Sequence, residues 1–432
     1  MIPRVSLSRA ALVLFSLCAA CAPSPLVRSA QMGDWRALAS LLEARLKAGD
    51  VSASEVRNVS RATIDFELSA GSDADVLARL GELSNCAGLI VPFLDERKNK
   101  HDGIGAHAAT MLFELGKLAP DDVRGWADDD DAQWRALGVR GLVRNGDGEK
   151  RAKALVDPDG RVRLSAVFAV RDAGEVAEAP LLIEVARLDS ESLNRLHAIR
   201  AIAASPSAGA KEVCALRDIW EGADDALRRE IALAWVTSTS LFLGGGRERL
   251  IAILAAGGLS GPTIAAAAAV TRLRRNDKEI DQLAVTVLER ALTHGSLLDK
   301  IHVLSAAVID HSSVLQDAVK KLADETEVEV RVAAHIKLAG LAHTRKASVA
   351  ALFVIANDAG HALTHQARLA LARLEERDVI ALLERDLGDA STAVKISAAD
   401  ALATLGEHPR AARVIADGNV SVRVRAACSL GR

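Results

Sequence analysis

One pattern recurs along most of this 432-residue chain. An acidic residue in a turn is followed six positions later by a base, and small residues stand three and six positions after that base, as in Asp157, Arg163, Ala166 and Ala169. Self-similarity at a fixed period is typical of stacked structural units, so this pattern restricts the fold more than any single segment does. The acid–base pairs are Asp129 with Arg135, Asp157 with Arg163, Asp189 with Arg195, Glu325 with Arg331, Asp389 with Lys395, and Asp417 with Arg423.

The spacing of these pairs gives units of roughly 28–36 residues, which is enough for two helices and two turns. Residues three and six positions after the base share one face of a helix, and alanine there allows a neighbouring helix to approach closely. The sequence therefore predicts an all-α solenoid of stacked antiparallel helix pairs over residues 31–432, with about ten or eleven units. The copies are degenerate over 31–120 and 205–310.

The charges of the motif have a predicted structural role. The acid precedes the second helix of the unit, where it can cap free N–H groups at the positive helix end. The base lies one turn into that helix and can reach the acid of its own or of an adjacent unit. We therefore expect a ladder of acid–base pairs along the array, which fixes the register of the units more than it adds stability.

The turn acid followed by a base resembles the motif of HEAT repeats, in particular the HEAT-like type named after phycobilisome lyases. Lys395 replaces the arginine of that family in one copy. The family uses the base to open the second helix, which fits the order of elements predicted here. The resemblance covers about residues 125–205 and 320–432 well, so it implies an α-solenoid there.

A stacked array of helix pairs offers a long concave face lined by its second helices, suited to a protein or an extended peptide. We therefore expect a non-enzymatic protein-binding scaffold, whose partner is not identified by the sequence. The alternative is an enzyme or a cofactor or chromophore binder, similar to the lyases, that uses the groove. The candidate binding positions on the concave face are Arg140, His197, Arg200, His302, Gln366 and Asp400.

Composition argues against other kinds of site. Aromatic residues make up 3% of the chain and the net charge is −3, whereas nucleic-acid binding normally needs a basic excess on one face. No histidine is followed by glutamate, so the iron site of the HEAT-like hydroxylases has no matching ligands. We expect no catalytic residue, no metal, no cofactor and no nucleic-acid partner.

The amino terminus has the features of an export signal. Residues 1–20 combine Arg4 and Arg9 with a short apolar run, and Ala19, Ala20 and Cys21 resemble the lipobox of bacterial lipoproteins, with Cys18 where the family prefers leucine. We expect lipidation of Cys21, a linker over 21–30, and attachment to the bacterial cell envelope through the lipid only. Ala22 in place of aspartate favours the outer membrane, and a secreted or periplasmic protein is the alternative.

Two further expectations concern the ends of the array. Cys86, Cys214 and Cys428 are separated by several predicted units, which suggests buried unpaired thiols rather than disulfides. No helix follows the last predicted unit at 422–428. Its apolar side is therefore expected either to fray or to meet another surface, such as a second copy of the chain.

Overall fold

The computed structural model describes residues 23–174, 178–359 and 362–432. The expected export signal at 1–20 and the lipidation site at Cys21 lie outside these residues. Every regular element in the described part of the chain is a helix, and none of its residues forms a strand. Neighbouring helices pack against one another in sequence order. The predicted all-α, solenoid-like fold is confirmed.

The helices fall into two compact units. One is Arg97–Leu374, called the central unit here; the other combines the described residues up to Glu96 with Glu375–Arg432 and is called the terminal unit. Each unit is built from pairs of consecutive helices joined by a short turn. The helix that comes first in each pair is called the first helix and its successor the second helix.

The central unit begins with α7 (Gly103–Glu114) and α8 (Pro120–Val123). Its first helices are η2 (Arg124–Asp128), α10 (Gly148–Ala154), α12 (Ala179–Leu188), α14 (Ala210–Gly222), α17 (Arg247–Ala255), α19 (Lys278–His294), α21 (Ser313–Leu322) and α23 (Arg345–Asn357). The matching second helices are α9 (Ala132–Arg140), α11 (Gly160–Ala173), α13 (Ser192–Ala204), α15 (Asp225–Thr237), α18 (Gly261–Leu273), α20 (Leu297–Ala306), α22 (Val328–Ala339) and α24 (Thr364–Arg373). Short elements connect some pairs: η3 (Asn145–Asp147), α16 (Thr239–Leu241) and η4 (Phe242–Gly246).

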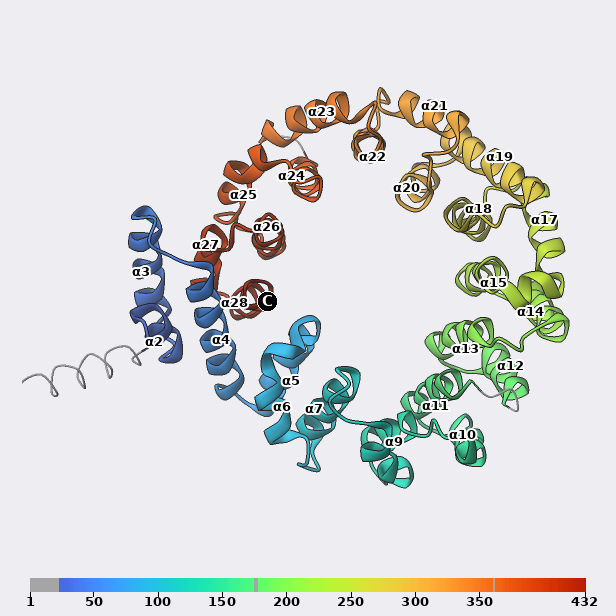
Figure 1. The fold of residues 1–432 in the computed structure, drawn as a ribbon, viewed down its shortest axis with the longest axis horizontal. Coiled ribbons are helices and arrows are strands. Elements are labelled where there is room, and N and C mark those ends of the chain that lie inside the picture. Colours follow the sequence, from blue (N-terminus) through green and yellow to red (C-terminus); the bar gives the residue numbers. More distant parts are fainter. Residues whose placement is uncertain (1–22, 175–177, 360–361) are drawn as a thin grey trace, which may run out of the picture. The chain divides into compact units, whose positions relative to one another are not determined.

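The second helices pack side by side along the concave edge of the central unit (Figure 1). The small residues of the motif lie at these contacts: Ala166 and Ala169 of α11 and Ala198 of α13 are fully buried. A side chain that ends at Cβ lets neighbouring helices approach closely, as the pattern predicts. One continuous apolar core runs from Ala127 to Leu341.

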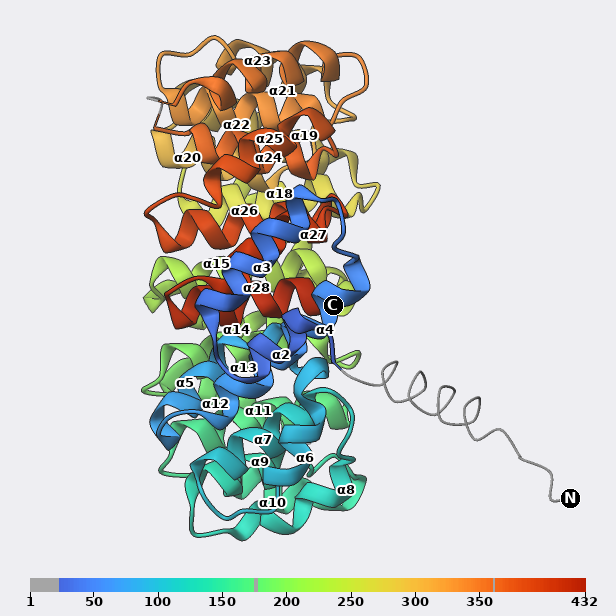
Figure 2. The ribbon, with the colours of Figure 1, turned by 90° about the vertical axis from the view of Figure 1, so that its left-hand side faces the viewer.

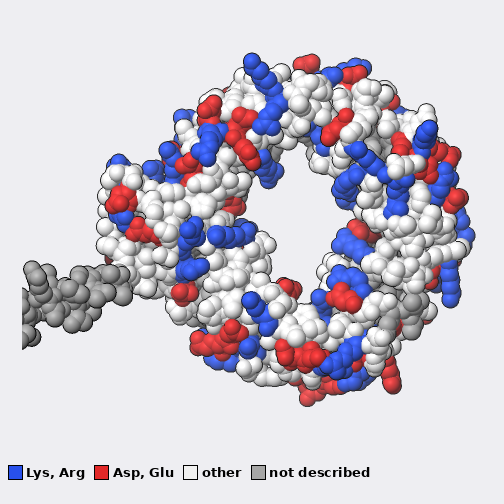
Figure 3. All heavy atoms as spheres, viewed as in Figure 1, with Lys and Arg blue, Asp and Glu red and all other residues white. Residues whose placement is uncertain are grey.

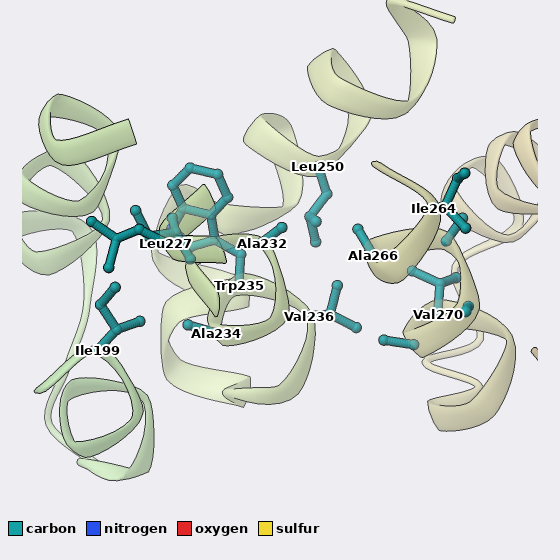
Figure 4. Packing of buried hydrophobic residues seen from close by; sticks show 14 of the residues in the cluster. Ile199, Leu227, Ala232, Ala234, Trp235, Val236, Leu250, Ile264, Ala266 and Val270 are labelled. Atoms are coloured by element: carbon teal, nitrogen blue, oxygen red, sulfur yellow. The ribbon is translucent and has the colours of Figure 1, made fainter. Parts of the chain in front are cut away.

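Trp235 is the largest side chain in the middle of this core. It extends from α15 and packs among Leu227, Ala232 and Leu250, which come from its own helix and from α17 (Figure 4). The neighbouring α18 contributes an alanine-rich face, including Ala266, that is completely buried. Here a single bulky residue and a row of small ones fill the space between adjacent second helices.

The glycine run at Gly244–Gly246 lies in η4, a π-helical segment before α17. Gly245 has φ 113°, a conformation that side chains rarely adopt, and a Cβ on Gly244 would lie 2.7 Å from the backbone of Gly209. Glycine is therefore required here by backbone conformation and by close packing.

The terminal unit joins the two ends of the chain. Its amino-terminal helices are α2 (Pro25–Gln31), α3 (Trp35–Lys47), α4 (Ala53–Ser69), α5 (Asp73–Glu82), η1 (Ser84–Ile90) and α6 (Val91–Arg97). Its carboxyl-terminal helices are η5 (Arg377–Val379), α25 (Ile380–Asp386), α26 (Thr392–Thr404), α27 (His408–Ala411), η6 (Ala412–Ala416) and α28 (Val420–Gly431). Helix α4 packs along α28 (Figure 1), and α3, which crosses in front of α28 in Figure 2, contacts η6. The pair α4–α5 thus takes the place of the next unit after α28.

Three expectations need correction here. The segment predicted as a linker contains α2, whose Leu26 and Ala30 are fully buried against α4. Cys86 and Cys428 form a disulfide across 342 residues, and the free Cys214 is exposed rather than buried. The expectation of unpaired thiols counted the units between the cysteines along the sequence. It did not consider that helices near the two ends of the chain pack against each other. The last helix meets another surface, which was one of the two expected alternatives, but that surface is α4 of the same chain and not a second copy.

In the described part of the chain, no single helix is both long enough and apolar enough to cross a bilayer. One bent pair, Asp73–Glu82 with Ser84–Arg97, meets the length and composition criteria despite an angle of 108°.

Candidate functional site

Four of the six bases of the repeated motif bind the backbone of their own turn. Arg135 Nη1 lies 2.7 Å from the carbonyl oxygen of Asp129, and Arg163 Nη1 lies 2.9 Å from that of Asp157. The same hydrogen bond joins Arg331 to the carbonyl of Glu325 and Arg423 to that of Asp417. The six-residue spacing therefore reflects a side chain in the second helix that satisfies a carbonyl in the turn before it.

The carboxylates of the motif bind the base of the preceding unit. Arg163 Nε lies 2.7 Å from Asp189 Oδ2, and these two side chains are 14% and 2% exposed. Equivalent pairs, 22 residues apart in each case, join Arg135 to Asp157 at 2.9 Å and Lys395 to Asp417 at 2.7 Å. The acid–base ladder thus links neighbouring units through side chains and holds each turn through the backbone.

Five of the six motif acids, all of them aspartates, also accept a hydrogen bond from the N–H two residues later. These bonds join Asp129 to Asp131, Asp157 to Asp159, Asp189 to Glu191, Asp389 to Ser391, and Asp417 to Asn419. Burial raises the pKa of Asp189, but hydrogen bonds from Arg163 and from the Glu191 N–H outweigh it, so the net pKa lies below its usual value. The ladder residues therefore use their hydrogen-bonding groups within the fold. A binding surface must be formed by side chains at other positions.

Arg195 departs from the expected ladder, and Lys300, which is not among the predicted bases, takes part in it. The hydrogen bond of Arg195 among the described residues goes to the carbonyl of Ala186, at 3.2 Å, and not to a turn acid. Lys300 binds Glu325 at 3.1 Å although His294, rather than an acid, precedes it by six residues. The carboxylate that pairs with a base belongs to the next unit. The residue six positions before the base therefore does not predict which acid forms the ion pair.

An arginine–phenylalanine cluster lies toward the carboxyl ends of α9, α11 and α13. The guanidinium of Arg140 lies 4.7 Å from the ring centre of Phe168 and 5.7 Å from that of Phe113. Arg171 lies 5.1 Å from the Phe168 centre on the same helix. The His197 ring meets Phe168 edge to face at 4.8 Å. Cations over aromatic faces and arginines at an accessible edge are typical of protein-binding surfaces.

Two carboxylates accompany this cluster. Asp172 accepts hydrogen bonds from Arg171, at 2.8 Å, and from Arg140, at 3.4 Å. Glu230 of α15 accepts two bonds of 2.8 Å from Arg200, one from Nε and one from Nη2. Basic side chains gather along this concave edge of the central unit (Figure 3).

The charge states of the cluster follow from its partly buried position. Burial lowers the pKa of the Arg140 guanidinium, although arginine stays charged at any physiological pH. Burial, together with the nearby Arg200 and Arg171, lowers the pKa of His197. His197 is therefore neutral near pH 7 and contributes a ring rather than a charge. Glu230 raises the pKa of Arg200.

The structure brings together three of the six predicted concave-face residues, namely Arg140, His197 and Arg200. His302 lies on α20, where burial and Arg229 lower its pKa, and Gln366 is exposed on α24. Asp400 belongs to the terminal unit, where it accepts a hydrogen bond from Ser429. The six residues therefore do not form one surface.

Sequence reasoning missed Phe168, which is the centre of the cluster. A usable signal was present: Arg140, Phe168 and Arg200 each follow the base of their unit by five residues. Equivalent positions on adjacent second helices form a row, so side chains at that position can meet across units. Arg171 and Asp172 lie about one turn further along α11 and have no such repeated position.

A separate cavity of about 620 Å³ lies in the terminal unit. Glu82 and Asn85 of the amino-terminal part line it together with Asp400, His408 and Arg425 of the carboxyl-terminal part. The residues that the structure describes include no group of three or more His, Cys, Asp or Glu side chains placed to hold a metal ion.

Comparison with known proteins adds no assignment, because no protein-family model and no curated protein matches the chain. The function is argued below from the geometry of the chain itself.

Proposed function

We propose that this chain is a non-enzymatic interaction scaffold of the bacterial cell envelope, built from HEAT-like repeats. It binds a protein or peptide along the second helices of the central unit. The arginine–phenylalanine cluster around Phe168 is the observation that carries this proposal. Arginine and aromatic side chains that stay accessible dominate the binding energy of many protein interfaces. The chain has few aromatic residues, so their concentration beside arginines favours a recognition surface.

Attachment to the envelope has two supports. Residues 1–20 and Cys21 have the composition of a lipoprotein signal. The disulfide between Cys86 and Cys428 fits an oxidising compartment outside the cytoplasm, where such bonds persist. A lipid on Cys21 would then tether an otherwise soluble array to the membrane.

Site-specific photocrosslinking in the producing cell tests both parts. A photoreactive residue replaces Arg229, which is exposed on the second helix α15, or Lys211, which is exposed on the first helix α14 and serves as the control. We expect one discrete adduct from position 229, none from 211, and loss of the adduct when Arg140→Ala and Arg171→Ala are combined. Equal capture at both positions would contradict a binding surface on the second helices.

The same cells report on anchoring. We expect the crosslinked protein in the membrane fraction, and Cys21→Ser should move it to the soluble fraction. Membrane attachment that survives Cys21→Ser would contradict the lipid anchor without affecting the crosslinking result.

A further inference from the structure

The three second helices that carry the cluster are strongly cationic. Helices α9, α11 and α13 contain seven arginines and one acidic residue, Asp172. The arginines near the helix starts have structural partners: Arg135, Arg161 and Arg163 bind turn acids, and Arg195 binds a carbonyl in the last turn of α12. The remaining arginines are Arg140, Arg171 and Arg200, which lie further along their helices. Arg140 and Arg171 contact the ring of Phe168, and Arg200 lies near His197. Among the described residues, these three cations of the surface make no hydrogen bond to the turn before their helix.

Carboxylates of the described residues do not satisfy all the N–H donors of these three guanidiniums. Glu230 accepts from Arg200, whereas Asp172 is shared by Arg140 and Arg171, and Glu114 acts on Arg140 through its charge. The side chains of Arg140 and Arg171 are 23% and 38% exposed, so solvent reaches both. A guanidinium has several N–H donors in a fixed plane, and one shared carboxylate cannot satisfy two of them. Several N–H donors of Arg140 and Arg171 therefore remain available at this point.

The chain itself shows what kind of group fits there. Arg200 holds Glu230 through two parallel bonds of 2.8 Å, the geometry with which arginine selects carboxylates. Phe168 and Phe113 provide apolar faces beside the cations, over which a peptide chain can lie. We propose, resting on the proposed function, that the bound segment of the partner is an acidic peptide. Its Asp or Glu carboxylates bind Arg140 and Arg171 and its backbone crosses the two phenylalanine rings.

Fluorescence anisotropy with the full chain tests this proposal. The probe is a fluorescein-labelled peptide of alternating glutamate and glycine, compared with the same peptide containing lysine in place of glutamate. We expect the acidic peptide to bind and the basic one not to bind. The affinity should fall as salt is raised, because exposed charges are screened.

Variants locate the interaction. Combining Arg140→Ala with Arg171→Ala should weaken binding about tenfold or more, as expected for the loss of central arginines. Arg140→Lys with Arg171→Lys should give an intermediate loss, since lysine keeps the charge but not the planar fork. The matched control combines Arg187→Ala on α12 with Lys211→Ala on α14, two exposed cations of first helices, and should leave affinity unchanged. Far-ultraviolet circular dichroism confirms that each variant remains helical.

The outcomes separate this inference from the proposed function. Equal affinity for the acidic and basic peptides, or unchanged affinity in the double alanine variant, overturns the acidic-peptide proposal. Tighter binding of a single-stranded RNA oligonucleotide than of the acidic peptide also overturns it. If the photocrosslinked partner at position 229 persists while the acidic peptide fails, the scaffold function stands and only this inference falls. Loss of both results removes the proposed function as well.

Discussion

Each arginine of the repeated motif can make two kinds of contact, and the units differ in how many they make. Arg163 binds the carbonyl of its own turn and the carboxylate of Asp189 in the next unit. Arg195 binds one carbonyl, that of Ala186. The buried carboxylate of Asp189 depends on Arg163 for its charge partner, whereas no buried acid depends in this way on Arg195 among the described residues.

Replacing these two arginines should therefore have unequal effects. Arg163→Ala leaves Asp189 buried without its cation and should lower the free energy of unfolding by about 1–3 kcal/mol. Arg195→Ala removes one hydrogen bond to a carbonyl and should cost about 0.5–1.5 kcal/mol. Urea unfolding followed by circular dichroism measures both losses. Equal losses would show that the bond between Arg163 and Asp189 adds nothing beyond the backbone contact.

How far the sequence predicts these contacts depends on their range. The position of four of the six bases follows from a bond to the carbonyl six residues earlier, which is a local relation and leaves a repeated spacing. The pair of Arg163 with Asp189 spans 26 residues, a separation set by the length of the unit. Because unit lengths vary, the spacing of the motif did not predict which acid pairs with Arg163. The cluster around Phe168 was missed because only one member of the row is aromatic, and a single phenylalanine leaves no repeated signal.

Among the helices, the contact of α4 with α28 is not indicated by the repeated spacing of acids and bases in the sequence. Arg423 of α28 donates to Glu67 of α4 through Nε at 2.9 Å and Nη2 at 2.6 Å, and both side chains are buried. The same guanidinium lies 4.5 Å from the ring centre of Trp35. Glu67 thus provides the carboxylate that the next turn acid would provide elsewhere in the ladder. Because 356 residues separate Glu67 from Arg423, no periodic signal could reveal the pairing.

Neutralising Glu67 should loosen this contact. Glu67→Gln removes the carboxylate that pairs with the buried Arg423, which should cost about 3 kcal/mol. Hydrogen exchange of residues 420–431 should then be faster by about two orders of magnitude, since local opening governs exchange. Glu55→Gln is the matched control on the same helix, because Glu55 pairs with Arg45 within the amino-terminal segment. Unchanged exchange in Glu67→Gln would show that apolar packing alone holds α28.

At the scale of the whole molecule, the chain divides into a central unit formed by one continuous segment and a terminal unit formed by both ends. The solenoid-like fold could be predicted because helical spacing and small residues are local features of the sequence. The terminal unit could not, because a unit at one end of an array normally lacks a neighbour. Here the amino-terminal helices provide that neighbour, and the disulfide between Cys86 and Cys428 makes the connection covalent. Closing so long a loop restricts the unfolded chain, which should stabilise the terminal unit by about 5 kcal/mol.

Peptide mapping by mass spectrometry without reduction tests this joining of the ends most directly. The purified protein is alkylated before digestion, so that free thiols are marked and cannot exchange. We predict that the peptide containing Cys86 is recovered linked to the peptide containing Cys428, and that Cys214 is alkylated. Recovery of Cys86 and Cys428 as alkylated thiols, or of either one linked to Cys214, would contradict a terminal unit built from both ends of the chain.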